Sequence, residues 1–213
     1  AFSTGSATMA VPNEGWGMAL GGNLNDNWYL IGGFADSNSD PTDPLDGLET
    51  FFDDREYFKH IELGWNASRE TAFLNNIHLT LWHNDEREAA ATPDGWGANL
   101  SFSKSLNEHW IPFLRLGYAK DAGTLLERSL STGFAYQTVP GGNQLGVAYN
   151  YGVPNESSWG PGLDDQQTLE VFYRIQLWKE FAITPDIQYI KDPALNPDDS
   201  SMWLFGLRGR FAF

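Results

Sequence analysis

Apolar and polar residues alternate along most of this chain, and the pattern is clearest in the stretch Ser201 to Phe213. Successive side chains of a β-strand point to opposite faces. One face here would carry Trp203, Phe205, Leu207, Phe211 and Phe213, and the other Gly206, Arg208, Arg210 and Ala212. An apolar face opposite arginines is typical of a transmembrane β-barrel strand. A C-terminal edge strand of a soluble β-sandwich or barrel would explain this stretch alone equally well.

The same alternation predicts about eleven strands. They run over residues 15–24, 27–36, 57–66, 76–85, 96–103, 110–119, 128–137, 143–151, 169–178, 183–190 and 201–213. The connections are alternately short turns, such as Asn25-Asp26 and Val139 to Gly142, and long polar loops. Outer-membrane barrels have short periplasmic turns and longer external loops. We therefore expect an all-β fold, an antiparallel transmembrane barrel of about 11 to 12 strands in this chain.

Eleven is an awkward number for a barrel. Every backbone amide must be paired in the membrane core, so the sheet has to close, and single-chain bacterial barrels close with an even number of strands. Two explanations stay open. Either residues 1 to 13, which are small and polar, contribute a twelfth strand, or the chain is part of a larger barrel.

The segment Ser37 to Glu56 is too long for an ordinary hairpin loop and carries Pro41, Pro44 and seven acidic residues. Its second half, Leu45 to Asp54, could hold one or two helical turns. A water-filled barrel is wider than a monosaccharide, and selectivity needs a constriction. We therefore expect this segment to fold into the lumen, and the alternative is that it covers the external mouth.

Composition adds a few limits. The 213 residues suit one all-β domain, and the lack of cysteine excludes a disulfide scaffold. An aromatic fraction of 15% is typical of barrels with aromatic girdles. No window approaches the roughly 18 apolar residues of a membrane helix, so any crossing is made by strands of about 9 to 11 residues. The N-terminal residues have no positively charged region followed by an apolar core, so we expect no signal peptide.

The formal net charge of -15 argues against a nucleic-acid partner, because phosphate binding needs clustered Lys and Arg. The acidic residues gather in predicted loops, from Asp36 to Glu56 and at Asp164, Asp165, Asp192, Asp198 and Asp199. The simplest interpretation is solvated loop tips. The alternative is that divalent cations at these acidic loops bridge to anionic lipid headgroups outside the barrel.

Several runs resemble the carbohydrate-selective porins of the OprB type. They are NWYLIGGFAD (27–36), DPTDPLDG (40–47), TFFDDREYFKHIELGW (50–65), NIHLTLWHNDERE (76–88), PDGW (93–96), FLRLGY (113–118) and LLER (125–128). The resemblance spans most of the chain from about Gly15 onward. It implies one porin domain over residues 1–213 that belongs to a sixteen-stranded barrel of a bacterial outer membrane and passes glucose and similar sugars by diffusion. The chain is similar to the C-terminal half or more of such a porin, without several N-terminal strands.

A sugar offers hydroxyls and a faintly apolar ring face, so its site needs planar hydrogen-bonding groups and an aromatic platform. The predicted inward faces supply both. The candidate substrate-binding residues are Arg115, Arg174, Arg208, Arg210, Glu62, Glu170, His60, His78, Trp82 and Trp178, with Asn84 and Gln176 beside them. The alternative for the arginines is that they form ordinary lumen ion pairs with Glu62, Glu170 and Asp186 and contact no sugar.

Other function classes have weaker support. The chain has no G-x-S-x-G, H-E-x-x-H or phosphate-binding glycine loop, so we expect no enzyme and no cofactor. His60 and His78 are expected as hydrogen-bonded lumen residues and not as metal ligands. The expected partners are monosaccharides or small oligosaccharides, outer-membrane lipid and lipopolysaccharide. A non-transporting outer-membrane barrel, a homo-oligomer and a pore completed by another chain remain alternatives.

Overall fold

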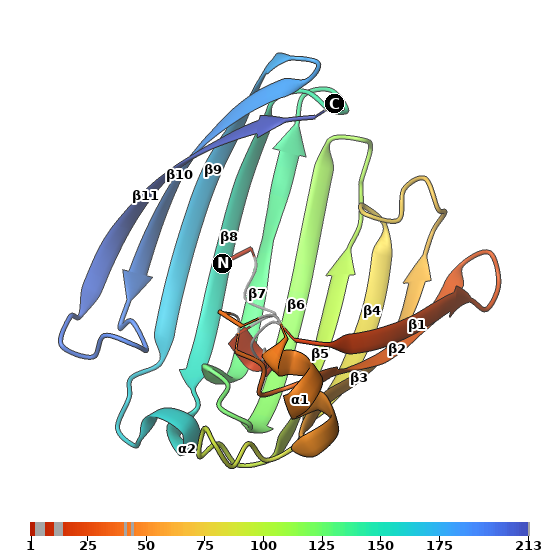
Figure 1. Ribbon diagram of the computed structural model, residues 1–213. Helices are drawn as coiled ribbons and strands as arrows, with labels where there is room; N and C mark the ends of the chain where they lie inside the picture. The colour runs from red at the N-terminus through yellow and green to blue at the C-terminus, as the bar shows by residue number, and fades with distance from the viewer. Residues whose placement is uncertain (3–6, 11–14, 41, 44, 213) are drawn as a thin grey trace.

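Eleven antiparallel strands form one sheet in which each strand pairs with its neighbours in sequence, from β1 to β11. The computed structural model describes residues 1–2, 7–10, 15–40, 42–43 and 45–212. Figure 1 shows the strands side by side, with most of the long connections at one end of the sheet and most of the short turns at the other. The all-β, single-sheet architecture expected from the alternating pattern is confirmed.

The strands agree closely with the ranges expected from the sequence. They are β1 (Gly17–Asn23), β2 (Trp28–Asp36), β3 (Tyr57–Asn66), β4 (Asn76–Asn84), β5 (Gly95–Ser103), β6 (Trp110–Asp121), β7 (Leu126–Gln137), β8 (Gln144–Pro154), β9 (Gln166–Trp178), β10 (Phe181–Lys191) and β11 (Ser201–Phe211). Two short helices, α1 (Asp46–Asp53) and α2 (Glu156–Trp159), lie in the long connections. Among the described residues, no helix has the length and apolar character needed to cross a membrane.

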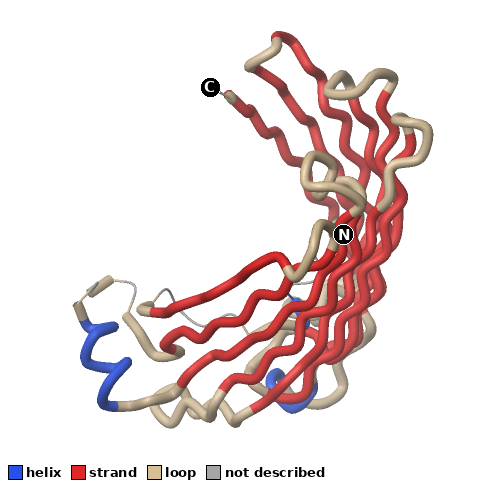
Figure 2. The backbone as a smooth tube through the Cα atoms, turned by 90° about the vertical axis from the view of Figure 1, so that its right-hand side faces the viewer, coloured by secondary structure: helices blue, strands red, loops and turns tan. Residues whose placement is uncertain are grey.

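The sheet curls into an open arc, with β1 and β11 at its two edges (Figure 2). The barrel is not closed within the described residues, because β1 pairs only with β2 and β11 only with β10. An odd number of antiparallel strands makes the first and last run in the same direction. The two edges could therefore not join each other in an antiparallel ladder.

Residues 1 to 13 do not supply a twelfth strand where they are described. Residues 1–2 and 7–10 form no strand, and residues 7–8 adopt a short 3₁₀ turn. The described part of residues 1 to 13 therefore gives no support to the explanation by a twelfth strand.

The register of the ladders separates apolar from polar side chains. One row across the convex face consists of leucines that pair from β2 to β7, namely Leu30, Leu63, Leu79, Leu100, Leu116 and Leu130. The neighbouring row on the concave face pairs Glu62, Thr80, Asn99, Gly117 and Ser129. The alternation read from the sequence thus becomes two chemically different surfaces of one sheet.

Aromatic rings lie along both rims of the convex face. Near the short turns, the Trp110 ring lies 4.8 Å from that of Tyr136, and the Phe181 and Phe211 rings stack at 4.3 Å. Near the long connections, Trp96 lies 5.4 Å from Tyr118 and Tyr189 lies 4.8 Å from Trp203. Two aromatic belts that flank an aliphatic band are typical of a barrel surface in contact with lipid.

The convex face is open where a soluble protein would cover it. On β11 the exposed fractions are 78% for Phe205, 76% for Leu207 and 65% for Phe211, while Arg208 and Arg210 lie on the concave side. Phe213, expected on the same apolar face, lies outside the described residues. A soluble β-sandwich would bury such a face against a second sheet, and the described residues form only one sheet.

Adjacent positions on β10 test this assignment of the faces. Ile187 pairs with Phe205 on the convex face, and Gln188 pairs with Glu170 on the concave face. We expect Ile187→Arg to lower the free energy of unfolding in lipid vesicles by about 2 to 4 kcal/mol, because it places a charge in the hydrocarbon near the middle of the strand. The control Gln188→Arg should change it little. Urea titration of both variants measures the difference, and equal losses would contradict the assignment.

Candidate functional site

The concave face carries its polar groups in separate clusters, and the first surrounds Glu62. Tyr29 Oη donates to Glu62 Oε1 at 2.9 Å and Thr80 Oγ1 donates to Glu62 Oε2 at 2.6 Å. His78 Nδ1 lies 3.3 Å from Glu62 Oε1. Strands β2, β3 and β4 bring these groups together, and the Tyr29 ring lies over Gly64, where a Cβ would be 2.1 Å from it. Glu62 and His78 are thus inward as expected, but they bind each other.

The N-terminal residues lie against the concave face, which the sequence did not indicate. Trp82 Nε1 donates to the carbonyl oxygen of Thr8 at 3.2 Å, and Thr8 Oγ1 donates to Asn99 Oδ1 at 2.6 Å. A Cβ on Gly117 would lie 1.9 Å from Thr8 Oγ1, so this contact requires glycine. Thr8 is fully buried and Ala10 is 6% exposed. Residues 8 to 10 therefore pack over β4, β5 and β6.

Phe2 occupies the same face nearer to the other edge. Its ring lies 5.2 Å from Phe113 on β6 and 5.0 Å from Phe172 on β9, and its backbone N–H donates to Glu170 Oε2 at 3.2 Å. The described N-terminal residues therefore span the concave face from β4 to β9, and they narrow the space in front of it. The available sequence signal was the inward Gly117, which leaves room for Thr8 of this segment.

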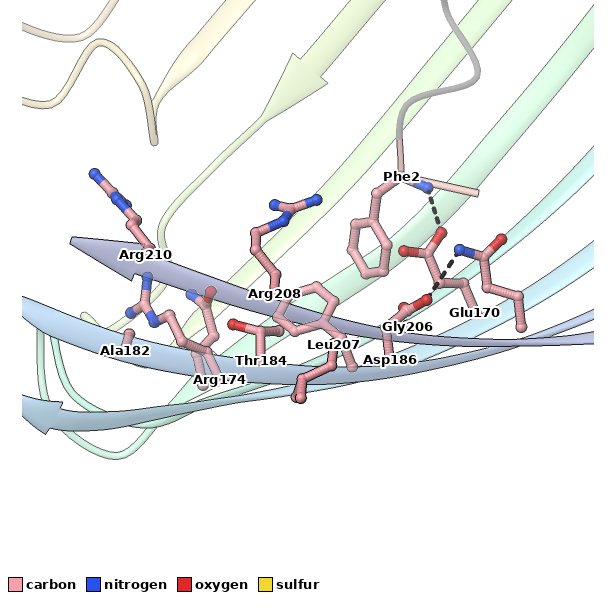
Figure 3. A pocket seen from close by; sticks show the side chains of 13 residues that line it. Phe2, Glu170, Arg174, Ala182, Thr184, Asp186, Gly206, Leu207, Arg208 and Arg210 are labelled. Carbon is pink, nitrogen blue, oxygen red and sulfur yellow. Dashed lines mark hydrogen bonds between the residues drawn. The ribbon is translucent and has the colours of Figure 1, made fainter.

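The three arginines near the C-terminal edge line a hollow of about 460 Å³ (Figure 3). Arg174 projects from β9, and Arg208 and Arg210 project from β11; Thr184, Asp186 and Gln188 of β10 lie between them. Arg174 Nη2 donates to the carbonyl oxygen of Gly142 at 3.0 Å. Gln188 Nε2 donates to Asp186 Oδ1 at 3.0 Å. The structure thus brings together three of the expected arginines with Glu170, which lines the same hollow.

Ion pairs do not account for these arginines. Among the described residues, no salt bridge involves Arg115, Arg174, Arg208 or Arg210. Glu62 binds His78, and Glu170 binds the N-terminal residues. The alternative that the arginines pair with Glu62, Glu170 and Asp186 is therefore wrong. Arg115 lies apart from the other three, with its guanidinium 5.2 Å from the centre of the Phe113 ring.

The two expected tryptophan platforms are not free on the concave face. Trp82 does face inward, but the N-terminal residues cover it to 3% exposure. Trp178 lies elsewhere, because the β9–β10 register shifts at Phe181 and pairs these two residues. Its ring stacks 5.6 Å from that of Phe181, which in turn stacks on Phe211 of the convex face. The rings that line the arginine hollow are instead Phe2 and Phe172.

The remaining candidate residues, His60, Asn84 and Gln176, each have local contacts. The His60 ring stacks 5.9 Å from Phe58, and its Nδ1 is buried without a hydrogen-bond partner. Asn84 is 1% exposed and accepts a hydrogen bond from Ser37 Oγ at 2.7 Å. Gln176 Nε2 donates to the carbonyl oxygen of Trp178 at 2.5 Å. None of these three residues lines the arginine hollow, although Gln176 lies two residues after Arg174 on β9.

The acidic segment around α1 lies at the rim and not in the lumen. The Phe51 ring contacts Phe34 at 5.9 Å and Tyr57 at 5.2 Å, and Tyr57 Oη donates to the Phe51 carbonyl at 2.7 Å. Phe34 and Tyr57 belong to the convex set of β2 and β3. The helix offers an aromatic side, which packs on the aromatic rim. The expectation that this segment folds into the lumen is thus wrong for its described residues.

Three titratable groups of this rim, those of Lys59, His83 and Asp85, are paired with one another. Lys59 Nζ donates to both oxygens of Asp85 at 2.7 Å, and His83 Nδ1 lies 3.4 Å from Asp85 Oδ1. Burial raises the pKa of Asp85, but hydrogen bonds from Lys59 and the Tyr57 amide outweigh it and hold the pKa below its usual value. Within the part of the chain that the structure describes, no three His, Asp or Glu side chains are grouped to hold a metal ion.

Comparison with known families gives one match. The sequence model of the carbohydrate-selective porin, OprB family, matches residues 1–213, which is the whole chain. No curated protein matches the chain significantly.

The anchoring of the N-terminal residues can be tested at Trp82. Trp82→Phe removes the hydrogen bond to Thr8, and Trp82→Ala also removes the ring, a loss of about 3 to 5 kcal/mol for a buried tryptophan. We expect faster hydrogen exchange at residues 7–10 in both variants, and much faster exchange in Trp82→Ala. The control is Trp96→Ala, on the convex face of the next strand, which should leave these amides unchanged. Unchanged exchange in Trp82→Ala would show that the ring does not hold the segment.

Proposed function

Because the chain belongs to the carbohydrate-selective porin, OprB family, we propose that its sheet forms part of the wall of an outer-membrane channel for sugars. The convex face would contact lipid and lipopolysaccharide, and the concave face would line water. An odd number of further strands would bring the eleven to the sixteen that the family resemblance implies, with antiparallel pairing at both edges.

The observation that carries the proposal is the division of the sheet into an apolar and a polar face. Charged groups on a lipid-facing surface cost about 2 to 4 kcal/mol near the midplane, and the three arginines of the hollow all lie on the opposite side. The exposed leucines of the convex face would be equally unfavourable in water. A lipid environment outside and water inside satisfy both surfaces at once.

The arginine hollow supplies the groups that a monosaccharide or small oligosaccharide needs. Guanidinium forks donate to hydroxyl oxygens, and Asp186, Gln188 and Thr184 accept from hydroxyl groups. Phe2 and Phe172 offer ring faces to the apolar side of the sugar. Its volume of about 460 Å³ falls in the range of ordinary small-molecule sites. We assign this hollow as the sugar site of the lumen.

The N-terminal residues serve as the constriction in this proposal. Phe2 lies directly beside the hollow, and Thr8 and Ala10 are held on the wall farther round the arc. Selectivity in a wide barrel depends on such an inserted segment, because the wall alone leaves an aqueous channel much larger than a monosaccharide.

Two glycines of β11 allow a matched test of the transport path. Gly206 lines the hollow, where an added Cβ would lie 3.5 Å from Asp186, and Gly209 lies on the convex face near Phe181. We expect Gly206→Trp to fill the hollow and lower glucose-driven swelling of proteoliposomes severalfold. Gly209→Trp should leave the swelling rate unchanged, since tryptophan is favourable at a lipid-facing rim.

The outcomes of this experiment separate the function classes. Equal swelling rates in the two variants would place the sugar path away from β11. If the unmodified protein swells liposomes no faster than protein-free controls do, the channel is refuted in favour of a non-transporting outer-membrane barrel. Each variant is first checked for the same strand content and urea midpoint, so that a folding defect is not mistaken for occlusion.

A further inference from the structure

The charge of the concave face is uneven in a way that the overall composition hides. The chain has a formal net charge of -15, yet Arg174, Arg208 and Arg210 line a single hollow between β9 and β11. The carboxylates of the same hollow are Glu170 and Asp186. Glu170 already accepts a hydrogen bond from the Phe2 amide at 3.2 Å, and Asp186 accepts one from Gln188. The cations outnumber the anions here.

The arginines keep donors that nothing in the described chain satisfies. No carboxylate lies within 4.0 Å of their nitrogens among the described residues. Arg174 Nε is buried without a hydrogen-bond partner, although Nη2 binds Gly142. A buried donor of a charged group without a partner is costly, and such groups are normally satisfied by a ligand, water or ion.

An unsatisfied acceptor lies in the same hollow. Asp186 Oδ2 is buried and has no hydrogen-bond partner, while Asp186 Oδ1 is bound by Gln188. A sugar hydroxyl would donate to this oxygen. The hollow therefore presents a buried, unsatisfied acceptor on β10 and a buried, unsatisfied donor on β9, with the exposed guanidinium groups of Arg208 and Arg210 on β11 beside them.

The cationic surface continues toward the short turns. A second hollow of about 200 Å³ shares Arg174, Ala182 and Arg210 with the first, and it adds Lys179 and Glu180. Arg174 and Arg210 thus stand where the two hollows meet. A ligand anion in the first hollow would keep a cationic neighbour as it moved toward the end of the sheet.

We propose that Arg174, Arg208 and Arg210 form a binding site for the anionic group of an acidic sugar, either a carboxylate or a phosphate. This inference rests on the proposed sugar channel and narrows its substrate class. A guanidinium has five donors and no acceptor, and it binds carboxylate or phosphate oxygens through two parallel hydrogen bonds. A neutral sugar can occupy the donors but leaves the clustered positive charges uncompensated. An anionic sugar satisfies both requirements, and its hydroxyls reach Asp186.

The experiment is a calorimetric titration of the full chain in detergent micelles with glucose, glucuronate and glucose 6-phosphate. We expect each anionic sugar to bind about tenfold or more tightly than glucose, because hydrogen bonds between ionised groups are roughly twice as strong as neutral ones. Arg174→Gln, Arg208→Gln and Arg210→Gln should each weaken binding of the anionic sugars about tenfold and change glucose binding less. The two anions compared with each other identify the preferred group.

A matched control is Arg128→Gln, which removes an arginine bound to Glu127 at the far rim of β7. It should leave all three affinities unchanged. If Arg174→Gln misfolds because its side chain is half-buried, Arg208→Gln and Arg210→Gln, whose side chains are exposed, still carry the test. Raising the salt concentration should weaken the anionic sugars only.

Two results would overturn the proposal: glucose binding as tightly as both anions, or equal losses in Arg128→Gln and the three hollow variants. Swelling assays distinguish a failure of the acidic-sugar site from a failure of the proposed channel. Glucose-driven swelling without anion preference refutes the acidic-sugar site alone. Absence of swelling with every sugar refutes the channel, while tight anion binding in the titration would still support the arginine site.

Discussion

The pairing of backbone amides between neighbouring strands is the constraint on which the rest of this structure depends. A strand in hydrocarbon cannot satisfy its N–H and C=O groups with water, and each unsatisfied group would cost several kcal/mol. Every strand from β2 to β10 pairs on both sides, and only the two edges remain open. Once the ladders are fixed, each side chain is committed to one face. A shift of one residue would exchange the leucine row with the row of Glu62 and Thr80.

The assignment of each side chain to one face explains where the arginines of the sheet lie. The cost of a charge in lipid places Arg174, Arg208 and Arg210 on the concave face irrespective of function. Placement alone would leave them free to form ion pairs with the carboxylates of the same face. They do not, because Glu62 binds hydroxyls and His78 while Glu170 binds the N-terminal residues. Strand pairing therefore decides on which face of the sheet each arginine lies. The neighbouring hydrogen bonds and ion pairs decide which of the polar groups in the hollow remain unoccupied.

The parts of the fold that follow from a period of two could be predicted from the sequence. The strand Tyr57–Asn66 has the bounds expected from its alternation, and the inward position of Glu62, Arg115 and Arg208 follows from parity alone. What could not be predicted depends on contacts between distant residues. Trp178 leaves the inward set because of one register shift against Phe181, which no alternation within β9 reveals.

The helical turns expected within Leu45 to Asp54 are present as α1, but the positions of α1 and of the N-terminal residues could not be predicted, for a similar reason. Neither segment has the two-residue alternation of apolar and polar side chains that marks a strand. Its position therefore depends on which surface of the sheet its side chains can pack against. Phe51 packs against the aromatic rim formed by Phe34 and Tyr57, and Thr8 occupies the space next to Gly117, which has no side chain. A long acidic loop was the obvious candidate for a lumen constriction, but its aromatic helix fits the rim better than a water-filled space.

The division of the concave face has a consequence for how a channel wall of this kind can work. Around β2 to β4, Glu62 has its oxygens occupied by Tyr29, Thr80 and His78, so this carboxylate offers a solute little to bind. Around β9 to β11, the buried Nε donor of Arg174 and the buried Oδ2 acceptor of Asp186 have no partner among the described residues. In the proposed channel, the arginine hollow is therefore a part of the concave face where a buried donor and a buried acceptor remain for a solute to bind, and Phe2 lines the same hollow.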